Sequence, residues 1–400
     1  MTGTVDHASS TRRPGAVRNL ALATTAFALT FWAWNLIGPL SKTYTGQLGL
    51  SPTRTATLVA VPVLVGSVGR VPVGVLTDRF GGRVMFTAAC FVSIVPTALV
   101  GLLHDSYPGL LAWGFLLGIA GTSFAVGIPF VNAWYPPGRR GFATGMFGAG
   151  MGGTAVSAFL TPRLADWLGV TGTHLAMCAA LAVMGVIMWL FARDAPDWRP
   201  STEPAMPRIR AALRLRVTWQ LSLLYAIAFG GFVAFSTYLP TMLTAVYHFD
   251  QSGAGMRTAG FSLAAVVARP VGGILSDRIG PVKVCLVSFF GATIMAVVLS
   301  FHPAPEIPAG TAFVVMAIAL GLGTGGVFAL VAKLVEARRV GTVTGLVGAA
   351  GGLGGYFPPL LMGVIFQLTG SYAIGLMLLA ATALAVGVFT LRVFGGADRQ

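Results

Sequence analysis

Two arginines in the middle of long apolar segments are the residues of this chain best suited to bind a charged ligand. Arg70 and Arg269 are 199 positions apart, and each stands eight residues before an Asp-Arg pair. A guanidinium group stays protonated and presents its N–H donors in a planar fork, which matches two oxygens of a small planar anion. The pair therefore predicts a permanently cationic site for an anion.

The depth of these arginines in the membrane indicates that they have a function. Eight residues of helix span about 12 Å, and half the hydrocarbon thickness of a bilayer is about 15 Å. An arginine near the midplane costs at least about 2.5–3.5 kcal/mol. A buried ion pair would offset that cost, but all twelve Asp and Glu residues fall in predicted loops or tails. We therefore expect an anionic ligand to be the counter-ion of Arg70 and Arg269.

The composition predicts that helices crossing a membrane hold these arginines. The chain is 55% hydrophobic and 10% charged, with a mean hydropathy of +0.80, whereas about a quarter of a soluble domain is charged. About twelve apolar stretches have the length of roughly 20 residues that spans a bilayer. They lie near 17–40, 54–76, 83–103, 108–134, 141–165, 172–193, 217–245, 254–276, 283–302, 308–334, 341–368 and 372–394. The prediction is an all-α polytopic membrane protein.

The distribution of Lys and Arg predicts the orientation of the chain. With both termini inside, twenty basic residues fall in internal segments and four in external ones, which follows the positive-inside rule. The sequence thus predicts a multi-pass protein of the cell inner (cytoplasmic) membrane with both termini cytoplasmic. The net charge of +14 is explained by this bias, so the lipid bilayer is the expected partner and nucleic acid is not. We expect a monomer.

The segment that contains Arg70 is repeated around Arg269, which predicts two related halves. Arg70, Gly74, Leu76, Asp78, Arg79 and Gly81 all have identical counterparts 199 positions later. Internal repeats of this kind, with a binding site at the midplane between them, are typical of alternating-access carriers. The predicted division is a cytoplasmic tail (1–16), an N-terminal six-helix half (17–193), a cytoplasmic linker (194–216), a C-terminal six-helix half (217–394) and a second tail (395–400).

Three further groups of residues have both a functional and a packing interpretation. The charged turns at Asp78-Arg79 and Asp277-Arg278 could lock helices together in one state, or only anchor the topology. The glycine-rich runs 145–153 and 345–355 permit close helix packing, and their position beside the arginines suggests that they also border the site. An aromatic stripe comprises Tyr225, Phe229, Phe232 and Phe235, and such stripes more often serve packing.

The sequence contains no pattern that predicts an enzyme, a metal site or a cofactor. The five histidines fall in tails, loops or helix ends, and the three cysteines have no pairing or ligand spacing. A phosphate loop or dinucleotide fingerprint in a strand–helix context is also lacking. A channel would need rings of polar side chains in an oligomer. A signalling or structural membrane protein stays open as another class.

The motifs quoted above resemble those of the major facilitator superfamily. The run from Ala60 to Gly74 and the run from Gly345 to Pro359 are similar to the nitrate/nitrite porter family, and the likeness extends over nearly all of 20–393. It implies the major facilitator fold, with about twelve transmembrane helices in two pseudo-symmetric six-helix halves. It also implies transport of nitrate or nitrite, as in nitrate assimilation, with a small inorganic anion as the substrate. The family's substrate residues match Arg70, Arg269, Phe124, Tyr225 and Phe229, and its glycine-rich signatures place Gly150, Gly153 and Gly351 beside the substrate.

Two positions depart from the family pattern. Asparagine is usual where this chain has Gly153, and a Gly-Asn-Gly pattern is common where it has Thr324 between two glycines. Both changes remove amide contacts to the anion and leave the choice between nitrate and nitrite open. An anion between the arginines would neutralise their repulsion, which favours nitrate/nitrite exchange; proton symport and a carrier for another small anion, such as a carboxylate, are the alternatives.

Overall fold

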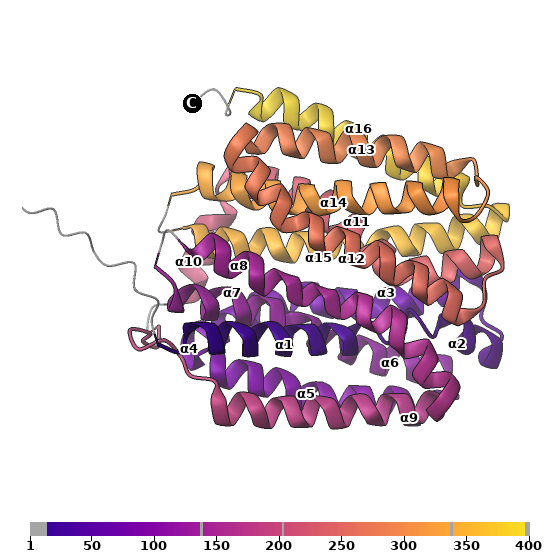
Figure 1. Cartoon of the computed structure of the whole chain (residues 1–400), viewed down its shortest axis with the longest axis horizontal. Helices are drawn as coiled ribbons and strands as arrows, with labels where there is room; N and C mark the ends of the chain where they lie inside the picture. The colour runs from indigo at the N-terminus through magenta and orange to yellow at the C-terminus, as the bar shows by residue number, and fades with distance from the viewer. Residues whose placement is uncertain (1–13, 137–138, 202–203, 337–338, 397–400) are drawn as a thin grey trace, which may run out of the picture.

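Helices run along the long axis of the molecule from one end to the other (Figure 1). The computed structural model describes residues 14–136, 139–201, 204–336 and 339–396, and the regular structure in these residues is helical. The earlier part of the chain occupies the lower part of the view in Figure 1 and the later part the upper. The arrangement confirms the predicted all-α class.

The first half of the chain forms the helices up to residue 191. These are α1 (Ala16–Trp34), α2 (Ser41–Leu48), α3 (Pro52–Val68), α4 (Arg70–Phe80), α5 (Gly82–Leu102), α6 (Tyr107–Leu117), η1 (Gly118–Thr122), α7 (Ser123–Trp134), α8 (Arg140–Gly148), η3 (Ala149–Gly152) and α9 (Gly153–Phe191).

The linker and the second half form the remaining helices. These are α10 (Ala205–Leu213), α11 (Arg216–Tyr247), α12 (Gln251–Ile279), α13 (Pro281–Ser300), α14 (Ile307–Leu334), α15 (Val340–Thr369) and α16 (Ala373–Phe394). Helix α10 lies inside the stretch 194–216, for which the sequence predicted only a polar linker.

One predicted helix is broken immediately before Arg70. The stretch 54–76 is divided into α3 and α4, which meet at Gly69 with a bend of 40°. Pro72 explains the break, because proline has no N–H to donate to the carbonyl of Val68 and its ring clashes with that carbonyl. The bend places Arg70 at the first residue of a new helix.

The number of membrane spans agrees with the prediction. In the part of the chain that the structure describes, nine helices are long and apolar enough to cross a membrane, or ten if α3 and α4 form one span. One of them, 143–191, has 49 residues and is interrupted at Gly169 by a left-handed φ of 71°, so it accounts for two crossings. With α1, which has 19 residues but is not among these nine, the pattern is consistent with the twelve predicted spans.

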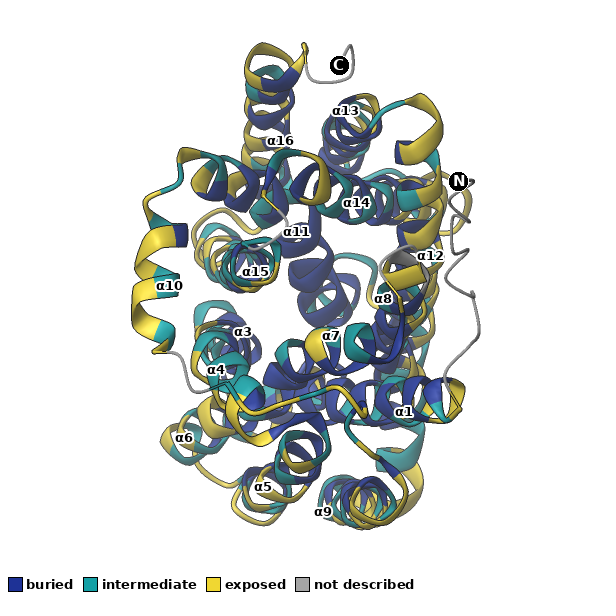
Figure 2. Ribbon diagram, turned by 90° about the vertical axis from the view of Figure 1, so that its left-hand side faces the viewer, coloured by how far each residue is buried: buried dark blue, intermediate teal, exposed yellow. Residues whose placement is uncertain are grey.

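The two halves pack through α3 against α15 and through α9 against α12. Viewed along the helices, buried residues fill the middle of the molecule and α10 lies at its edge beside α15 and α4 (Figure 2). Glycine permits close approach within each half: a Cβ added to Gly153 would lie 1.9 Å from the carbonyl oxygen of Ala28, and one added to Gly230 would lie 2.6 Å from the backbone of Gly354. Small residues at such crossings are typical of membrane helices.

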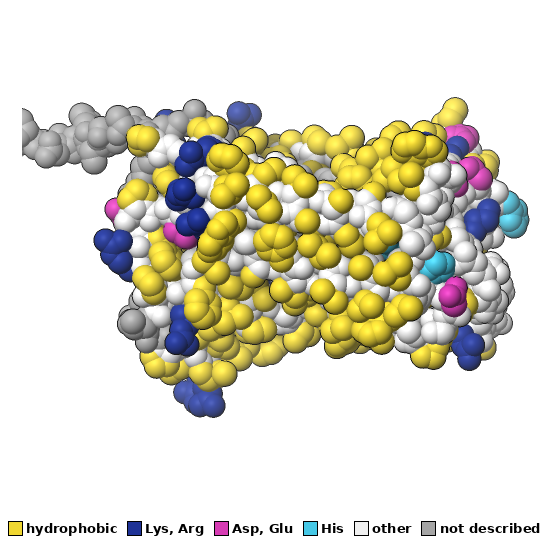
Figure 3. Space-filling model, turned by 90° about the horizontal axis from the view of Figure 1, so that it is seen from below, with side chains coloured by type: hydrophobic (Ala, Val, Ile, Leu, Met, Phe, Trp, Pro, Cys, Tyr) yellow, Lys and Arg dark blue, Asp and Glu magenta, His cyan; other side chains and the backbone are white. Residues whose placement is uncertain are grey.

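Charged side chains gather at the two ends of the molecule (Figure 3). Lys and Arg crowd one end, and the band between the ends is largely hydrophobic on the face shown. The exposed large apolar residues lie on helices from both halves. A bilayer is the solvent that suits such a band, so the surface fits a membrane protein whose arginine-rich end contains α10.

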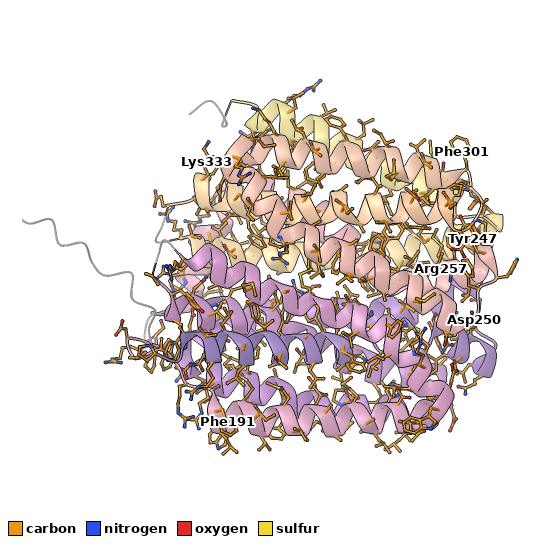
Figure 4. The ribbon with its side chains drawn as sticks, viewed as in Figure 1. Phe191, Tyr247, Asp250, Arg257, Phe301 and Lys333 are labelled. Atoms are coloured by element: carbon orange, nitrogen blue, oxygen red, sulfur yellow. The ribbon has the colours of Figure 1, made fainter. Side chains whose placement is uncertain are left out.

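The end opposite to the arginine-rich end is closed by hydrogen bonds between the halves. The hydroxyl of Thr241 donates to Ser41 at 2.7 Å, and the hydroxyl of Thr43 donates to the side chain of Gln251 at 2.7 Å. Figure 4 shows Tyr247, Asp250 and Arg257 at this end and Phe191 and Lys333 at the other. The two halves therefore meet at the α2 end as well as in the middle.

Candidate functional site

Arg70 is buried at the N-terminus of α4 and reaches across to the second half. It is 3% exposed, and its Nη1 donates to the carbonyl oxygen of Gly348 on α15 at 2.7 Å. Its Nε and Nη2 are buried without a hydrogen-bond partner. Buried donors are nearly always satisfied in proteins, so these two nitrogens mark a place for an acceptor from a ligand.

Arg269 is buried in the middle of α12 and reaches in the opposite direction, from the second half to the first. It is 6% exposed, and its Nη1 donates to the thioether sulfur of Met151 in η3. The backbone of Gly148, at the end of α8, also lies beside this guanidinium. Each arginine thus contacts a glycine-rich segment of the other half.

A phenylalanine from the first half lies between the two arginines. The centroid of the Phe124 ring is 4.9 Å from the guanidinium carbon of Arg70 and 5.7 Å from that of Arg269. Phe229 lies 5.3 Å from Arg70, and Phe328 lies 5.5 Å from Arg269. Faces of aromatic rings attract cations, so the three rings orient and partly stabilise the two buried charges.

Tyr225 adds a hydroxyl group to this aromatic cluster. Its ring stacks on Phe229 with a centroid distance of 5.0 Å and an interplanar angle of 2°. The side chain is fully buried, and its hydroxyl has no well-formed hydrogen bond, although it lies near enough to Arg269 and Arg70 to interact with both charges. The hydroxyl is therefore free to donate to an anion held by the arginines.

The two guanidinium groups lack a carboxylate partner among the residues that the structure describes. Among the described residues, no Asp or Glu lies within ion-pair distance of Arg70 or Arg269. Their distances to the Phe124 ring, 4.9 and 5.7 Å, place the charges no more than about 11 Å apart, where they repel by at least about 1.5 kcal/mol at an effective dielectric constant near 20. An anion between them would remove this repulsion and satisfy the free donors of Arg70. The site is therefore suited to bind a small anion.

Comparison with known proteins identifies the family. The model of the Major Facilitator Superfamily matches residues 23–256 and 221–399. The chain belongs to the major facilitator superfamily. It is 54% identical over 379 residues to a "Probable nitrate/nitrite transporter NarK2" of Mycobacterium tuberculosis, with 94% of this chain and 96% of the relative covered. A "Nitrite extrusion protein" of Bacillus subtilis is 37% identical, with 94% of each chain covered. The chain is thus a member of the nitrate/nitrite porter family, a family of transporters.

Solved structures of the superfamily share the fold. A bacterial homolog of the human lysosomal transporter Spinster, in an inward-facing and occupied conformation, superposes with a TM-score of 0.74 at 20% identity and covers 96% of this chain and 98% of its own. The human organic anion transporter MFSD10 gives a TM-score of 0.71 at 15% identity and covers 94% of this chain and 100% of its own. These likenesses show the major facilitator fold alone.

The glycines predicted to border the substrate have different surroundings in this porter. Gly351 lies in the cluster, since an added Cβ would be 2.2 Å from the Tyr225 ring and 3.2 Å from Phe229. Gly150 packs against Phe27 of α1, and Gly153 packs against the backbone of Ala28. The structure therefore gives Gly150 and Gly153 a helix-packing role, and a substrate contact from either remains a prediction.

Thr324, which stands where the family commonly has asparagine, has its hydroxyl engaged within its own helix. It is buried in α14 and donates to the carbonyl oxygen of Gly321 at 2.7 Å. Threonine hydroxyls often bond in this way to a preceding carbonyl of their helix. The position therefore presents no free donor to an anion, whereas an asparagine amide has two.

The predicted gating residues lie at the arginine-rich end of the porter. Asp78 lies in the last turn of α4 and contacts the linker. Its carboxylate is 3.6 Å from Arg208 of α10, and its carbonyl oxygen accepts from the backbone N–H of Ser201. Asp277 and Arg278 occupy the corresponding end of α12. The linker thus touches the repeated turn in the first half, and a gating role for Asp78, Arg79, Asp277 and Arg278 remains a prediction.

A linker residue that the sequence did not single out supports the same turn. Oδ1 of Asp194 accepts from the backbone N–H of Gly82 at 2.7 Å and from that of Arg83 at 3.3 Å, so it caps the N-terminus of α5. Burial raises the pKa of the Asp194 carboxyl, against the effect of these hydrogen bonds and of the Arg83 charge. A carboxylate at a helix N-terminus is favoured by the free N–H groups there.

Sequence reasoning missed Phe328 among the residues at the arginines, and it named Met151 and Gly348 only as members of the glycine-rich runs predicted to border the site. A signal for the last two was present, because 145–152 and 345–352 align with a shift of 200 positions and share Gly145/Gly345, Gly148/Gly348, Ala149/Ala349 and Gly152/Gly352. This second repeat is the one that contacts the arginines of the opposite half. Phe328 had no comparable signal in the apolar sequence of α14.

Proposed function

We propose that this chain carries nitrate and nitrite across the cell membrane by alternating access, with the anion clamped between Arg70 and Arg269. The observation that carries the proposal is the pair of buried guanidinium groups, one from each half, that share one aromatic ring and have no carboxylate partner among the described residues. The printed names of the relatives from Mycobacterium tuberculosis and Bacillus subtilis agree with this substrate class.

The coupling that we propose is exchange of nitrate for nitrite. Closing the two halves brings two positive charges together, and a bound anion lowers the free energy of that step in either direction. A relative from Thermus thermophilus, 35% identical with 87% of this chain and 85% of the relative covered, is named "Probable nitrate/nitrite antiporter NarK1". Proton symport is the alternative, and the phenol of Tyr225 is a described acid group that interacts with both arginines.

We further propose the orientation and assembly that the charge pattern favours. The arginine-rich end, which holds the linker 194–216, faces the cytoplasm, in accordance with the positive-inside rule. The tails 1–16 and 395–400 lie mostly outside the described residues, and we propose the same side for them. The halves are then 17–193 and 217–394, and the protein works as a monomer in the cell inner membrane, because one chain supplies both arginines and the rings between them.

Counterflow in proteoliposomes tests the substrate and the coupling together. Vesicles loaded with nitrite should take up labelled nitrate rapidly, whereas vesicles loaded with formate, as a small carboxylate, should take up little. Empty vesicles with an imposed proton gradient should also show little uptake. Robust uptake into the empty vesicles would contradict exchange and favour proton symport. Faster uptake into the formate-loaded vesicles would contradict nitrate and nitrite as the substrates.

A further inference from the structure

Met151 is the one large side chain between Gly148 and Gly153. The residue at the equivalent position of the second half is of a different type. In the alignment of 145–152 with 345–352, Met151 corresponds to Gly351. Gly351 leaves room for the Tyr225 ring, which would clash with a Cβ there. Met151 instead fills its own position with an unbranched chain that ends in a polarisable sulfur.

The sulfur of Met151 engages a donor nitrogen of Arg269 that could otherwise serve an oxygen of an anion. It accepts the hydrogen bond from Nη1 of Arg269, and the side chain is 2% exposed, so water does not reach it freely. A thioether is a weak acceptor, and an ionised guanidinium forms much stronger hydrogen bonds with an anion. An incoming anion can therefore displace the sulfur from Arg269.

The contact also bridges the two halves of the molecule. Met151 belongs to the first half and Arg269 to the second, as Arg70 and Gly348 belong to the first and second halves in the reciprocal contact. Gly348 accepts through its backbone carbonyl, which any residue would provide. Of these two contacts, only the one made by Arg269 depends on the side chain of the acceptor residue. A carrier without an anion thus keeps a side-chain link across its site.

We propose that Met151 is a stand-in ligand of Arg269 that competes with the anion and stabilises the closed, empty carrier. This inference rests on the proposed function and deepens it. It has two consequences. The apparent affinity for the anion is lower than the arginines alone would give, because binding must displace the sulfur. Closure of the empty site is easier than repulsion between the arginines would allow, so exchange is accompanied by some net transport.

The test replaces Met151 by leucine, which keeps the volume of the side chain and removes the acceptor. Two quantities are measured for the purified full chain: the Kd of nitrate by equilibrium binding, and the ratio of nitrate uptake into empty proteoliposomes to uptake into nitrite-loaded ones. Met146→Leu is the matched control, because Met146 lies five residues earlier in the same glycine-rich run and is 49% exposed.

Met151→Leu should lower the Kd about 3- to 10-fold, somewhat less than the effect of a full charged hydrogen bond, and should lower the ratio of empty to loaded uptake. Met146→Leu should leave both unchanged. A side chain that only packs would give the opposite: an equal or higher Kd, with both uptake rates reduced in parallel. If Met151→Leu does not fold, Met151→Ala also lacks the acceptor and should change both quantities in the same direction.

The outcomes separate this inference from the proposed function. Wild-type binding of nitrate with an unchanged Kd and ratio in both Met151 variants overturns the role of Met151 and leaves the transport proposal intact. A wild-type protein that binds neither nitrate nor nitrite overturns both.

Discussion

The two arginines occupy matching positions in the two repeats, but their surroundings differ. Arg70 donates to the carbonyl of Gly348 and retains two buried nitrogens without a partner. Arg269 donates to the thioether of Met151. Phe124 lies against both, whereas Phe229 and Phe328 each lie against one.

This difference shows that a repeated sequence does not produce a symmetric site. Both arginines extend from broadly equivalent helices into the opposite half, and the opposite halves offer different groups. Arg70 has the larger unmet demand for an acceptor, so we expect it to make the stronger contact with the anion. Arg269 has an acceptor that an anion can replace. The predictions below test this inequality.

The largest effect is expected from replacing either arginine by lysine. Arg70→Lys and Arg269→Lys keep the charge but lose the planar fork, so paired hydrogen bonds to a planar anion become impossible. Each lost charged hydrogen bond is worth about 1.5–3 kcal/mol. Nitrate uptake by proteoliposomes should fall about 100-fold or more in both variants, with the greater loss of affinity in Arg70→Lys. Near wild-type uptake in either would contradict a bidentate site.

A large effect is also expected from Gly351→Ala. The new Cβ would lie 2.2 Å from the Tyr225 ring, so the ring must move from its stack on Phe229. Overpacking of this kind costs about 1–3 kcal/mol, and we expect nitrate affinity to fall at least about 10-fold. Gly345→Ala is the matched control on the same helix, because nothing lies within 4 Å of its added Cβ. Equal binding curves for the two variants would argue against Gly351 as a support of the site.

The aromatic cluster should show a graded response. Phe124→Leu removes a ring that faces both arginines, and each cation–π contact contributes about 0.5–2 kcal/mol. Its nitrate Kd should rise about 5- to 50-fold, more than in Phe229→Leu or Phe328→Leu, whose rings each face one arginine. If Phe328→Leu weakens binding as much as Phe124→Leu, the shared position of Phe124 has no special importance.

The smallest effect is expected at the charged turn. Asp78 is partly exposed and pairs with Arg208 at 3.6 Å, and exposed pairs of this kind contribute about 0.2–1 kcal/mol. Asp78→Asn should therefore leave the nitrate Kd unchanged and slow exchange by no more than about fivefold. Comparison with Asp277→Asn by stopped-flow exchange shows whether the two repeated turns gate equally. A change in Kd would connect the turn to the binding site itself.

The sequence by itself determined the fold class, the approximate helices and the pair of buried arginines. These predictions rest on the length of the apolar segments, on the internal repeat and on the bias of Lys and Arg. All three can be read from the linear sequence without knowledge of how the helices pack. The predicted ends of α5, α11, α13 and α16 lie within two residues of the structure. Arg70 and Arg269 could also be found from the sequence, because a charged residue in an apolar run is conspicuous there.

Only the tertiary structure decided what contacts each arginine. The partners of Arg70 and Arg269 lie 278 and 118 positions away along the chain, and Phe328 is one more apolar residue in an apolar helix. The roles of Gly150 and Gly153 also depended on the fold, because a glycine permits a close approach without specifying whether a helix or a substrate makes it. The way in which helices from the two halves cross decides which atoms meet in the site. The sequence repeat does not specify how these helices cross.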